Sequence, residues 1–106
     1  MKIILFVSSQ CPHCPAAEAI VSRVVSDYSG HGVSLNKIRM KTKAGKKRSS
    51  MYHVRAIPTT LILDDNGHEL KRLVGVMRED TLRASIEKLL GLRESVLSRI
   101  FGRKKC

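Results

Sequence analysis

The chain has 106 residues, three of them cysteines, and a formal net charge of +11. This length corresponds to one domain with a core of its own, and an odd number of cysteines excludes the all-paired disulfide scaffolds of small secreted proteins. No apolar run approaches the roughly 18 residues of a membrane-spanning helix. Five apolar residues after Lys2 are too few for a signal peptide. We therefore expect a monomeric, cytoplasmic protein without a membrane span.

The first half of the chain predicts a buried strand followed by a helix. Lys2–Val7 is β-rich and nearly all apolar, which is typical of a central strand buried on both faces. From Cys14 to about Tyr28, apolar residues recur at helical spacing. Pro12 suits the first helical position, where its missing N–H costs nothing. The sequence therefore predicts a β-α unit with a cysteine motif at its turn.

That motif is Cys11-Pro12-His13-Cys14. Unpaired N–H groups and the helix dipole stabilise a thiolate on a cysteine at a helix N-terminus. The second cysteine, one turn along, is close enough to close a disulfide on the first, so the spacing indicates a redox pair. The alternative is a soft-metal site made by both thiols and His13. It needs a dimer or a partner, because a closed zinc site takes four ligands.

The second half predicts two further helices and three strands. Val33–Met40 is the second strand, and a basic loop and a short helix follow it. Thr59–Leu63 and Glu69–Val74 are joined by a strong turn signal, Asp-Asp-Asn-Gly, and predict a hairpin. Residues 82–90 mark a last helix. The order β-α-β-α-β-β-α predicts an α/β fold with a mixed sheet of about four strands, helices on both faces and a parallel first unit.

Basic residues are concentrated in two places. The segment Lys37–Arg48 contains seven of them and no acid, and a second cluster closes the chain. Such clusters attract acidic proteins, nucleic acids or anionic lipids, and the alternative is a solvated surface. Four aromatic residues offer little for base stacking. We therefore expect an acidic protein partner at Lys37–Arg48 and no sequence-specific nucleic acid.

The end of the chain predicts a further amphipathic helix. Its apolar residues recur at helical spacing after Gly91: Leu92, Val96, Leu97, Ile100 and Phe101. We expect residues 91–106 to form a basic extension that packs on the domain of residues 1–90, with lipid-surface binding as the alternative. Cys106 is expected to be a free thiol and not a third catalytic group.

Residues 2–90 resemble the thioredoxin-like superfamily. The cysteine motif lies between the first strand and its helix, Ile57-Pro58-Thr59 stands just before the third strand, and Val74-Gly75 leads into the last helix. The resemblance implies a thioredoxin fold and a protein disulfide oxidoreductase that needs no cofactor or metal. It also implies protein disulfides as substrates and an upstream reductase or thiol donor.

The resemblance assigns roles to individual residues. It implies that Cys11 is the more exposed, nucleophilic thiol and that Cys14 is the resolving thiol, buried behind it. It implies that Pro58 is a cis-proline beside the disulfide. The backbone of Ile57 would pair with an extended substrate segment. Thr59 and Gly75 complete the implied substrate-binding set.

The middle of the motif is expected to tune the redox potential. Pro12 stiffens the turn, and His13 places an imidazole near Cys11. Stabilising the thiolate stabilises the reduced form and makes the disulfide a stronger oxidant. Pro-His also occurs in strongly oxidising periplasmic thiol oxidases of this fold. The resemblance therefore implies a couple less reducing than that of an ordinary thioredoxin.

Two positions depart from the thioredoxin pattern. Gln10 stands where a thioredoxin has Trp, and Leu5 stands where it keeps a buried Asp that helps move protons at the resolving thiol. These two features are more similar to a glutaredoxin or a small archaeal redox protein. However, Val74-Gly75-Val76 lacks the double glycine with which glutaredoxins hold glutathione. The sequence therefore lies between the two subfamilies.

Overall fold

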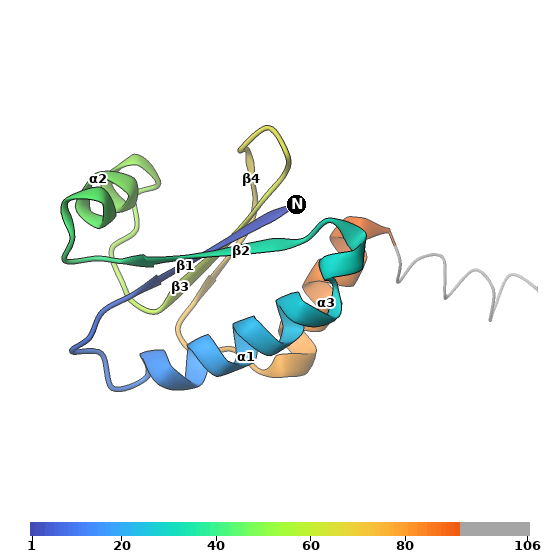
Figure 1. Cartoon of the computed structure of the whole chain (residues 1–106), viewed down its shortest axis with the longest axis horizontal. Coiled ribbons are helices and arrows are strands. Elements are labelled where there is room, and N and C mark those ends of the chain that lie inside the picture. The colour runs from blue at the N-terminus through green and yellow to red at the C-terminus, as the bar shows by residue number, and fades with distance from the viewer. Residues whose placement is uncertain (92–106) are drawn as a thin grey trace, which may run out of the picture.

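The computed structural model describes residues 1–91, which form a four-stranded sheet with helices on both faces (Figure 1). In chain order the elements are β1 (Lys2–Val7), α1 (Cys14–Asp27), the 3-10 turn η1 (Ser29–His31), β2 (Ser34–Arg39), α2 (Lys43–Met51), β3 (Thr59–Leu63), β4 (Glu69–Val74) and α3 (Glu79–Leu90). None of these helices is long and apolar enough to cross a membrane. The predicted extension lies outside the described residues except for Gly91, and so does Cys106.

The strands lie in the order β2-β1-β3-β4. β1 runs parallel to β2 and antiparallel to β3, and β4 pairs with β3 as a hairpin. This is the predicted mixed sheet with a parallel first unit. The register places Leu5 of β1 between Lys37 of β2 and Thr60 of β3.

Side chains of β1 alternate between two apolar cores, because successive residues of a strand point to opposite faces. Ile3, Leu5 and Val7 pack in one core with residues of α1 and α3. Ile4 and Phe6 belong to the other core, on the face that carries α2. Figure 1 shows α1 and α3 on one side of the sheet and α2 on the other. The predicted burial of the first strand on both faces is confirmed.

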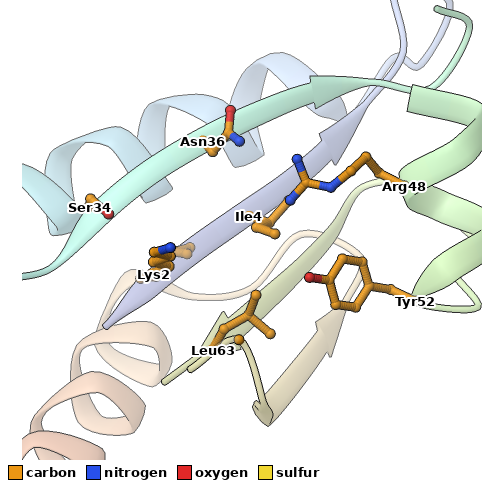
Figure 2. A pocket seen from close by; sticks show the side chains of 9 residues that line it. Lys2, Ile4, Ser34, Asn36, Arg48, Tyr52 and Leu63 are labelled. Atoms are coloured by element: carbon orange, nitrogen blue, oxygen red, sulfur yellow. The ribbon is translucent and has the colours of Figure 1, made fainter. Parts of the chain in front are cut away.

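The face that carries α2 is covered at one end only. Within α2 the buried residues are Gly45 and Ser49. Arg48 extends over the sheet from the C-terminal half of this helix, and Tyr52 does so from the residue that follows the helix (Figure 2). Within residues 1–91, no helix therefore covers the strands near Lys2, at the end of the sheet farthest from the cysteine motif.

The predicted short helix after the second strand is confirmed as α2, but the basic residues before and within it do not form a loop. These cations are divided between β2, a turn and α2, and four of them are helical: Lys43, Lys46, Lys47 and Arg48. The hydroxyl of Thr42 caps the helix by accepting a hydrogen bond from the Gly45 N–H at 2.9 Å. Gly45 also lets α2 approach β2, because a Cβ there would lie 1.8 Å from the Arg39 carbonyl oxygen.

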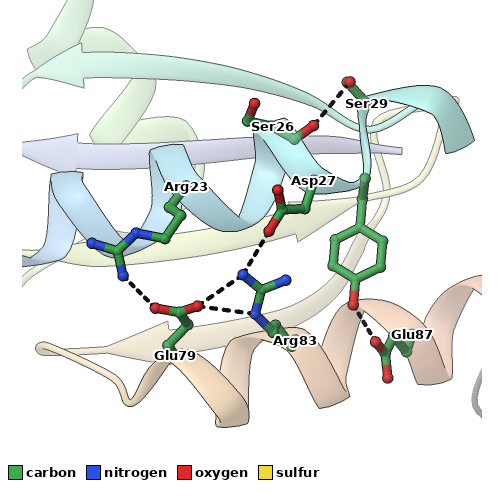
Figure 3. Close-up of polar contacts among 8 residues, drawn as sticks. Arg23, Ser26, Asp27, Ser29, Glu79, Arg83 and Glu87 are labelled. Carbon is green, nitrogen blue, oxygen red and sulfur yellow. Dashed lines mark hydrogen bonds and ion pairs between the residues drawn. The ribbon is translucent and has the colours of Figure 1, made fainter.

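Polar contacts join α1 to α3 across their shared core (Figure 3). Glu79 accepts hydrogen bonds from Arg83 and Arg23, and Arg83 also donates to Asp27 at 2.6 Å. The Arg83 and then the Arg23 guanidinium hold the pKa of Glu79 below its usual range. One turn farther along, the Tyr28 hydroxyl donates to Glu87. These contacts fix α1, which begins with Cys14, against α3.

Candidate active site

The cysteine motif forms a turn between β1 and α1. The Cys11 N–H donates to the Ser8 carbonyl at 3.2 Å, and the Cys14 N–H donates to the Cys11 carbonyl at 3.4 Å. Cys14 is the first residue of the helix. The predicted helical position of Pro12 is wrong, since Pro12 lies in the turn. Pro15 occupies the first helical turn instead, where no N–H is needed.

The two thiols differ in their exposure. Cys14 is 1% exposed, whereas Cys11 is half-buried, and neither forms a disulfide. Burial raises the pKa of the Cys14 thiol, and the hydrogen bond to Cys11 raises it further. A backbone hydrogen bond at Ser8 acts in the opposite direction. One sulfur is thus accessible to another molecule, and the other is held protonated behind it.

His13 lies at the N-cap position of α1, between the turn and the helix. Its carbonyl accepts the Ala17 N–H at 3.3 Å, but its side chain does not cap the helix. The imidazole is exposed and makes no hydrogen bond to any of residues 1–91. Pro12 is exposed beside it. Both middle residues of the motif therefore face solvent next to Cys11.

The Ile57-Pro58 segment lies at the same end of the sheet. The peptide bond between these residues is cis, as the resemblance implied. The next residue, Thr59, pairs with Phe6 at the end of β1, just before the cysteine motif. Ile57 and Cys11 pack against the same apolar core that contains Cys14. The fold therefore brings together two segments that are more than 40 residues apart in the chain.

Backbone contacts extend this group to Gly75. The Gly75 N–H donates to the Pro58 carbonyl at 2.8 Å, and Gly75 has a left-handed φ of 87° that favours glycine. Its neighbours Val74 and Val76 are 63% and 44% exposed. These two apolar side chains were not among the predicted site residues, although their alternation around a glycine is visible in the sequence. They give the site an apolar rim.

The surroundings of Cys14 include an ion pair that sequence reasoning did not find. Leu5 is fully buried in the core that contains Cys14. Glu18 lies one helical turn after Cys14, and its charge also raises the pKa of that thiol. Lys37, which pairs with Leu5 in the sheet, lies 3.6 Å from Glu18. The four-residue spacing of Cys14 and Glu18 was the available signal.

A second overlooked residue is Thr60, on the other side of Leu5 in the sheet register. Its hydroxyl is buried and has no hydrogen-bond partner among residues 1–91. The neighbouring Thr59 differs, because its hydroxyl donates to the Ala56 carbonyl at 2.6 Å. The predicted Thr59 is therefore held by a local backbone contact, whereas Thr60 is unsatisfied.

The metal-site alternative gains no support from the described part of the chain. No three His, Cys, Asp or Glu side chains of residues 1–91 lie close enough together to hold a metal ion. Cys11, Cys14 and His13 do not form such a group.

Comparisons with known proteins agree with this geometry. The thioredoxin family model matches residues 1–88. A probable thioredoxin of Archaeoglobus fulgidus is 34% identical over 90 residues, which cover 85% of this chain and 90% of the relative. A thioredoxin of Methanocaldococcus jannaschii is 31% identical, with coverages of 85% and 96%. Thioredoxin 1 from Thermosipho africanus has the same fold, with a TM-score of 0.74 at 21% identity, and covers 89% of this chain and 99% of its own. The chain thus belongs to the thioredoxin family and is a redox protein of the thiol-disulfide oxidoreductase kind.

Proposed function

We propose that this protein exchanges its Cys11–Cys14 dithiol or disulfide with disulfides of other proteins through a mixed-disulfide intermediate. The observation that carries this proposal is the unequal exposure of two thiols three residues apart. An accessible sulfur can attack a protein substrate, and a buried sulfur next to it can attack only the bond that the first has formed.

The reduction proceeds in two exchanges. The Cys11 thiolate attacks one sulfur of the substrate disulfide, whose S–S bond breaks, and the released substrate thiolate takes up a proton. Cys14 then loses its proton and attacks the Cys11 sulfur, which breaks the mixed disulfide and releases the second substrate thiol. Two electrons and two protons pass to the substrate, and an upstream reductase or thiol donor restores them.

The substrate segment binds beside the cis peptide bond. In this proposal the backbone of Ile57 pairs with an extended substrate strand, and Pro58, Thr59 and Gly75 shape the adjacent surface. The exposed Val74 and Val76 contribute apolar area to the same docking surface.

An acidic protein partner binds at Lys37–Arg48. This segment is linked to the cysteine motif, because the Lys41 ammonium donates to the Gln10 side chain, one residue before Cys11. A partner held by these cations would therefore lie near the reactive thiol. We place the activity in the cytoplasm, a reduced compartment in which paired cysteines are more often catalytic than structural.

His13 and Pro12 set the potential of the couple. We infer that the exposed imidazole next to Cys11 makes the couple less reducing than that of an ordinary thioredoxin. The measurement is the equilibrium of the Cys11–Cys14 couple against a defined thiol buffer, for the parent protein and for His13→Ala. A more reducing couple in the variant supports the role, and an unchanged potential removes His13 from the mechanism.

Trapping tests the assignment of the two cysteines. In a Cys106→Ser background, Cys14→Ser should accumulate a mixed disulfide with a protein substrate, because the resolving thiol is missing. Cys11→Ser should neither exchange nor accumulate the adduct. Intact-protein mass spectrometry under acid quench measures both outcomes. If Cys11→Ser is the variant that traps substrate, the roles are reversed, and if neither variant loses turnover the proposal fails.

A further inference from the structure

A hollow of about 370 Å³ lies on the sheet face that carries α2, away from the cysteine motif (Figure 2). Its floor is formed by Ile4 and Leu63, each only 2% exposed. Lys2 pairs with Leu63 and with Ser34 at the start of β1, whereas Cys11 follows the other end of that strand. The hollow exists because α2 covers only one end of this face.

Cationic side chains line the hollow from two sides. Lys2 extends from β1, and Arg48 reaches across from α2 toward Asn36 and Ile4 (Figure 2). No carboxylate lines the hollow, and neither cation has a carboxylate partner within residues 1–91. The Arg48 guanidinium lies 6.0 Å from the centre of the Tyr52 ring, which orients it. The potential in the hollow is therefore positive.

A neighbouring hollow shares Asn36 and Arg48 with the first one. Lys37 and Arg39 border it on the edge strand β2, but they stand in register with Leu5 and Val7 of the core under α1 and α3, so their side chains lie on the face opposite Arg48. Arg48 thus stands between two hollows, and its planar guanidinium presents paired N–H donors of the kind that match a phosphate.

Three neutral polar residues also line the first hollow. They are Ser34, Asn36 and Tyr52, and their side chains have no hydrogen-bond partner among residues 1–91. An apolar floor with a few polar groups and a volume of about 300–1,000 Å³ is typical of small-molecule sites. The hollow lies at the lower end of this range, so the matching ligand is small.

We propose that this hollow binds a small organic phosphate with an aromatic or apolar body. The phosphate lies between the Arg48 guanidinium and the Lys2 ammonium, and the body lies beside the Tyr52 ring, above the floor of the hollow. This site is independent of the cysteine chemistry, because none of its lining residues belongs to the candidate active site.

Phenyl phosphate is the probe for this site. Titrations of the full chain with phenyl phosphate, inorganic phosphate and phenol at constant ionic strength are followed by ¹⁵N–¹H NMR. We expect saturable shifts at Lys2, Ile4, Asn36, Arg48 and Tyr52. Phenyl phosphate should bind about tenfold more tightly than either fragment, since it combines the charge-assisted contact of the phosphate with the apolar contact of the ring.

A pair of variants separates the site from diffuse charge. Arg48→Gln should weaken phenyl phosphate binding by about tenfold. Lys47→Gln makes the same charge change at the next residue of α2, lines neither hollow, and should change the affinity by less than about twofold. If the NMR spectrum of Arg48→Gln is not that of a folded protein, Arg48→Lys is used instead. Arg48→Lys should bind phenyl phosphate more weakly than the parent, because the planar guanidinium with its paired N–H donors is lost.

Several outcomes overturn the proposal. Equal affinities for phenyl phosphate and inorganic phosphate would mean an adventitious ion only. Equal losses in Lys47→Gln and Arg48→Gln would mean unspecific attraction, and linear shifts or shifts centred on Cys11 would mean that the hollow is not the site. A poly-glutamate peptide that shifts the lining residues when phenyl phosphate does not would reassign the surface to protein docking.

Discussion

Glu18 and Lys37 provide an ionic environment for the resolving thiol that differs from the one implied by the family pattern. Leu5 is apolar and fully buried where a thioredoxin keeps an acid. The carboxylate of Glu18 acts on Cys14 from the next helical turn and is held by Lys37 at 3.6 Å. The negative charge near this thiol therefore comes from the helix that carries Cys14.

Glu18→Gln should lower the pKa of Cys14, because it removes a negative charge that disfavours the thiolate. The thiolate fraction at a given pH near neutrality should then rise. The measurement is an ultraviolet thiolate titration in a Cys11→Ser, Cys106→Ser background, where Cys14 is the only thiol. Asp27→Asn, which removes a charge at the far end of α1, is the control and should leave the pKa of Cys14 unchanged. A pKa of Cys14 that is unchanged or higher in Glu18→Gln would contradict this prediction.

Thr59 and Thr60 are adjacent and buried, but only the Thr59 hydroxyl has a hydrogen-bond partner within residues 1–91. Thr60→Val should raise the free energy of unfolding by about 1 kcal/mol, because it removes a buried hydroxyl that lacks a partner within residues 1–91. Thr59→Val should lower it by about 1 kcal/mol, because the hydrogen bond to the Ala56 carbonyl is lost. Urea unfolding measures both variants. Changes of the same sign would show that the hydroxyls are not what distinguishes the two sites.

Among the elements, α2 depends on one close backbone contact. Its cap at Thr42 and the position of Gly45 bring the first turn of the helix against the end of β2. A Cβ on Gly45 would meet the Arg39 carbonyl oxygen at 1.8 Å and its carbon at 2.7 Å. Backbone atoms cannot move aside by a change of rotamer, so a larger residue requires the helix to shift.

Gly45→Ala should lower the free energy of unfolding by about 1–3 kcal/mol, the usual cost of overpacking. This loss should outweigh the gain of about 1 kcal/mol in helix propensity. Gly30→Ala is the matched control, since a Cβ there meets no atom within 4 Å, and its effect should stay within about 0.5 kcal/mol. Thermal unfolding compares the two variants. A Gly45→Ala protein as stable as its parent would disprove the close contact.

The elements also show why the sequence predicted some features and not others. Thr59–Leu63 and Glu69–Val74 agree with the predicted strands because a strong turn signal separates two β-rich runs. The sequence predicts a short helix at α2 but not its full extent, because its buried positions are the small residues Gly45 and Ser49, which leave no apolar periodicity. The extent of the helix follows only from its contacts with the sheet.

The sequence likewise predicted some features of the candidate site and not others. The cysteine spacing and Ile57-Pro58 are local patterns, so the sequence predicted them. The Glu18–Lys37 pair joins α1 to β2, and the unpaired Thr60 hydroxyl depends on what surrounds β3. Neither is visible without the packing of the elements. The predicted start of α1 at Cys14 is confirmed, and only the helical position of Pro12 is wrong, since Pro15 is the proline of the first turn.

Over the whole molecule, charge is distributed unevenly. Every carboxylate side chain of residues 1–91 has an ion-pair or hydrogen-bond partner. The lysines of α2 have no carboxylate partner within this part of the chain. They are Lys43, Lys46 and Lys47. The excess positive charge of the described residues therefore includes an uncompensated group on the α2 face.

This asymmetry predicts salt-dependent association. Exchange with an acidic protein disulfide should slow as salt rises, because exposed charges are screened over about 8 Å at physiological ionic strength. Lys46→Gln combined with Lys47→Gln should slow it at low salt, whereas Lys71→Gln combined with Lys88→Gln should have a smaller effect. Stopped-flow kinetics with an acidic protein disulfide and a small neutral disulfide measures the difference. Equal salt dependence for both disulfides would leave the cations with a role in solubility alone.

The central place of β1 has a consequence for local opening of the fold. Amide hydrogens exchange fastest where few apolar side chains hold a segment, and slowest where exchange requires global unfolding. We therefore expect the amides of β1 and β3 to exchange most slowly and those of α2 to exchange faster, which NMR-detected hydrogen–deuterium exchange can measure. Equal protection of β1 and α2 would contradict this gradient. Because the cysteine turn continues directly from β1, α2 can open and close while the spacing between the two sulfurs persists.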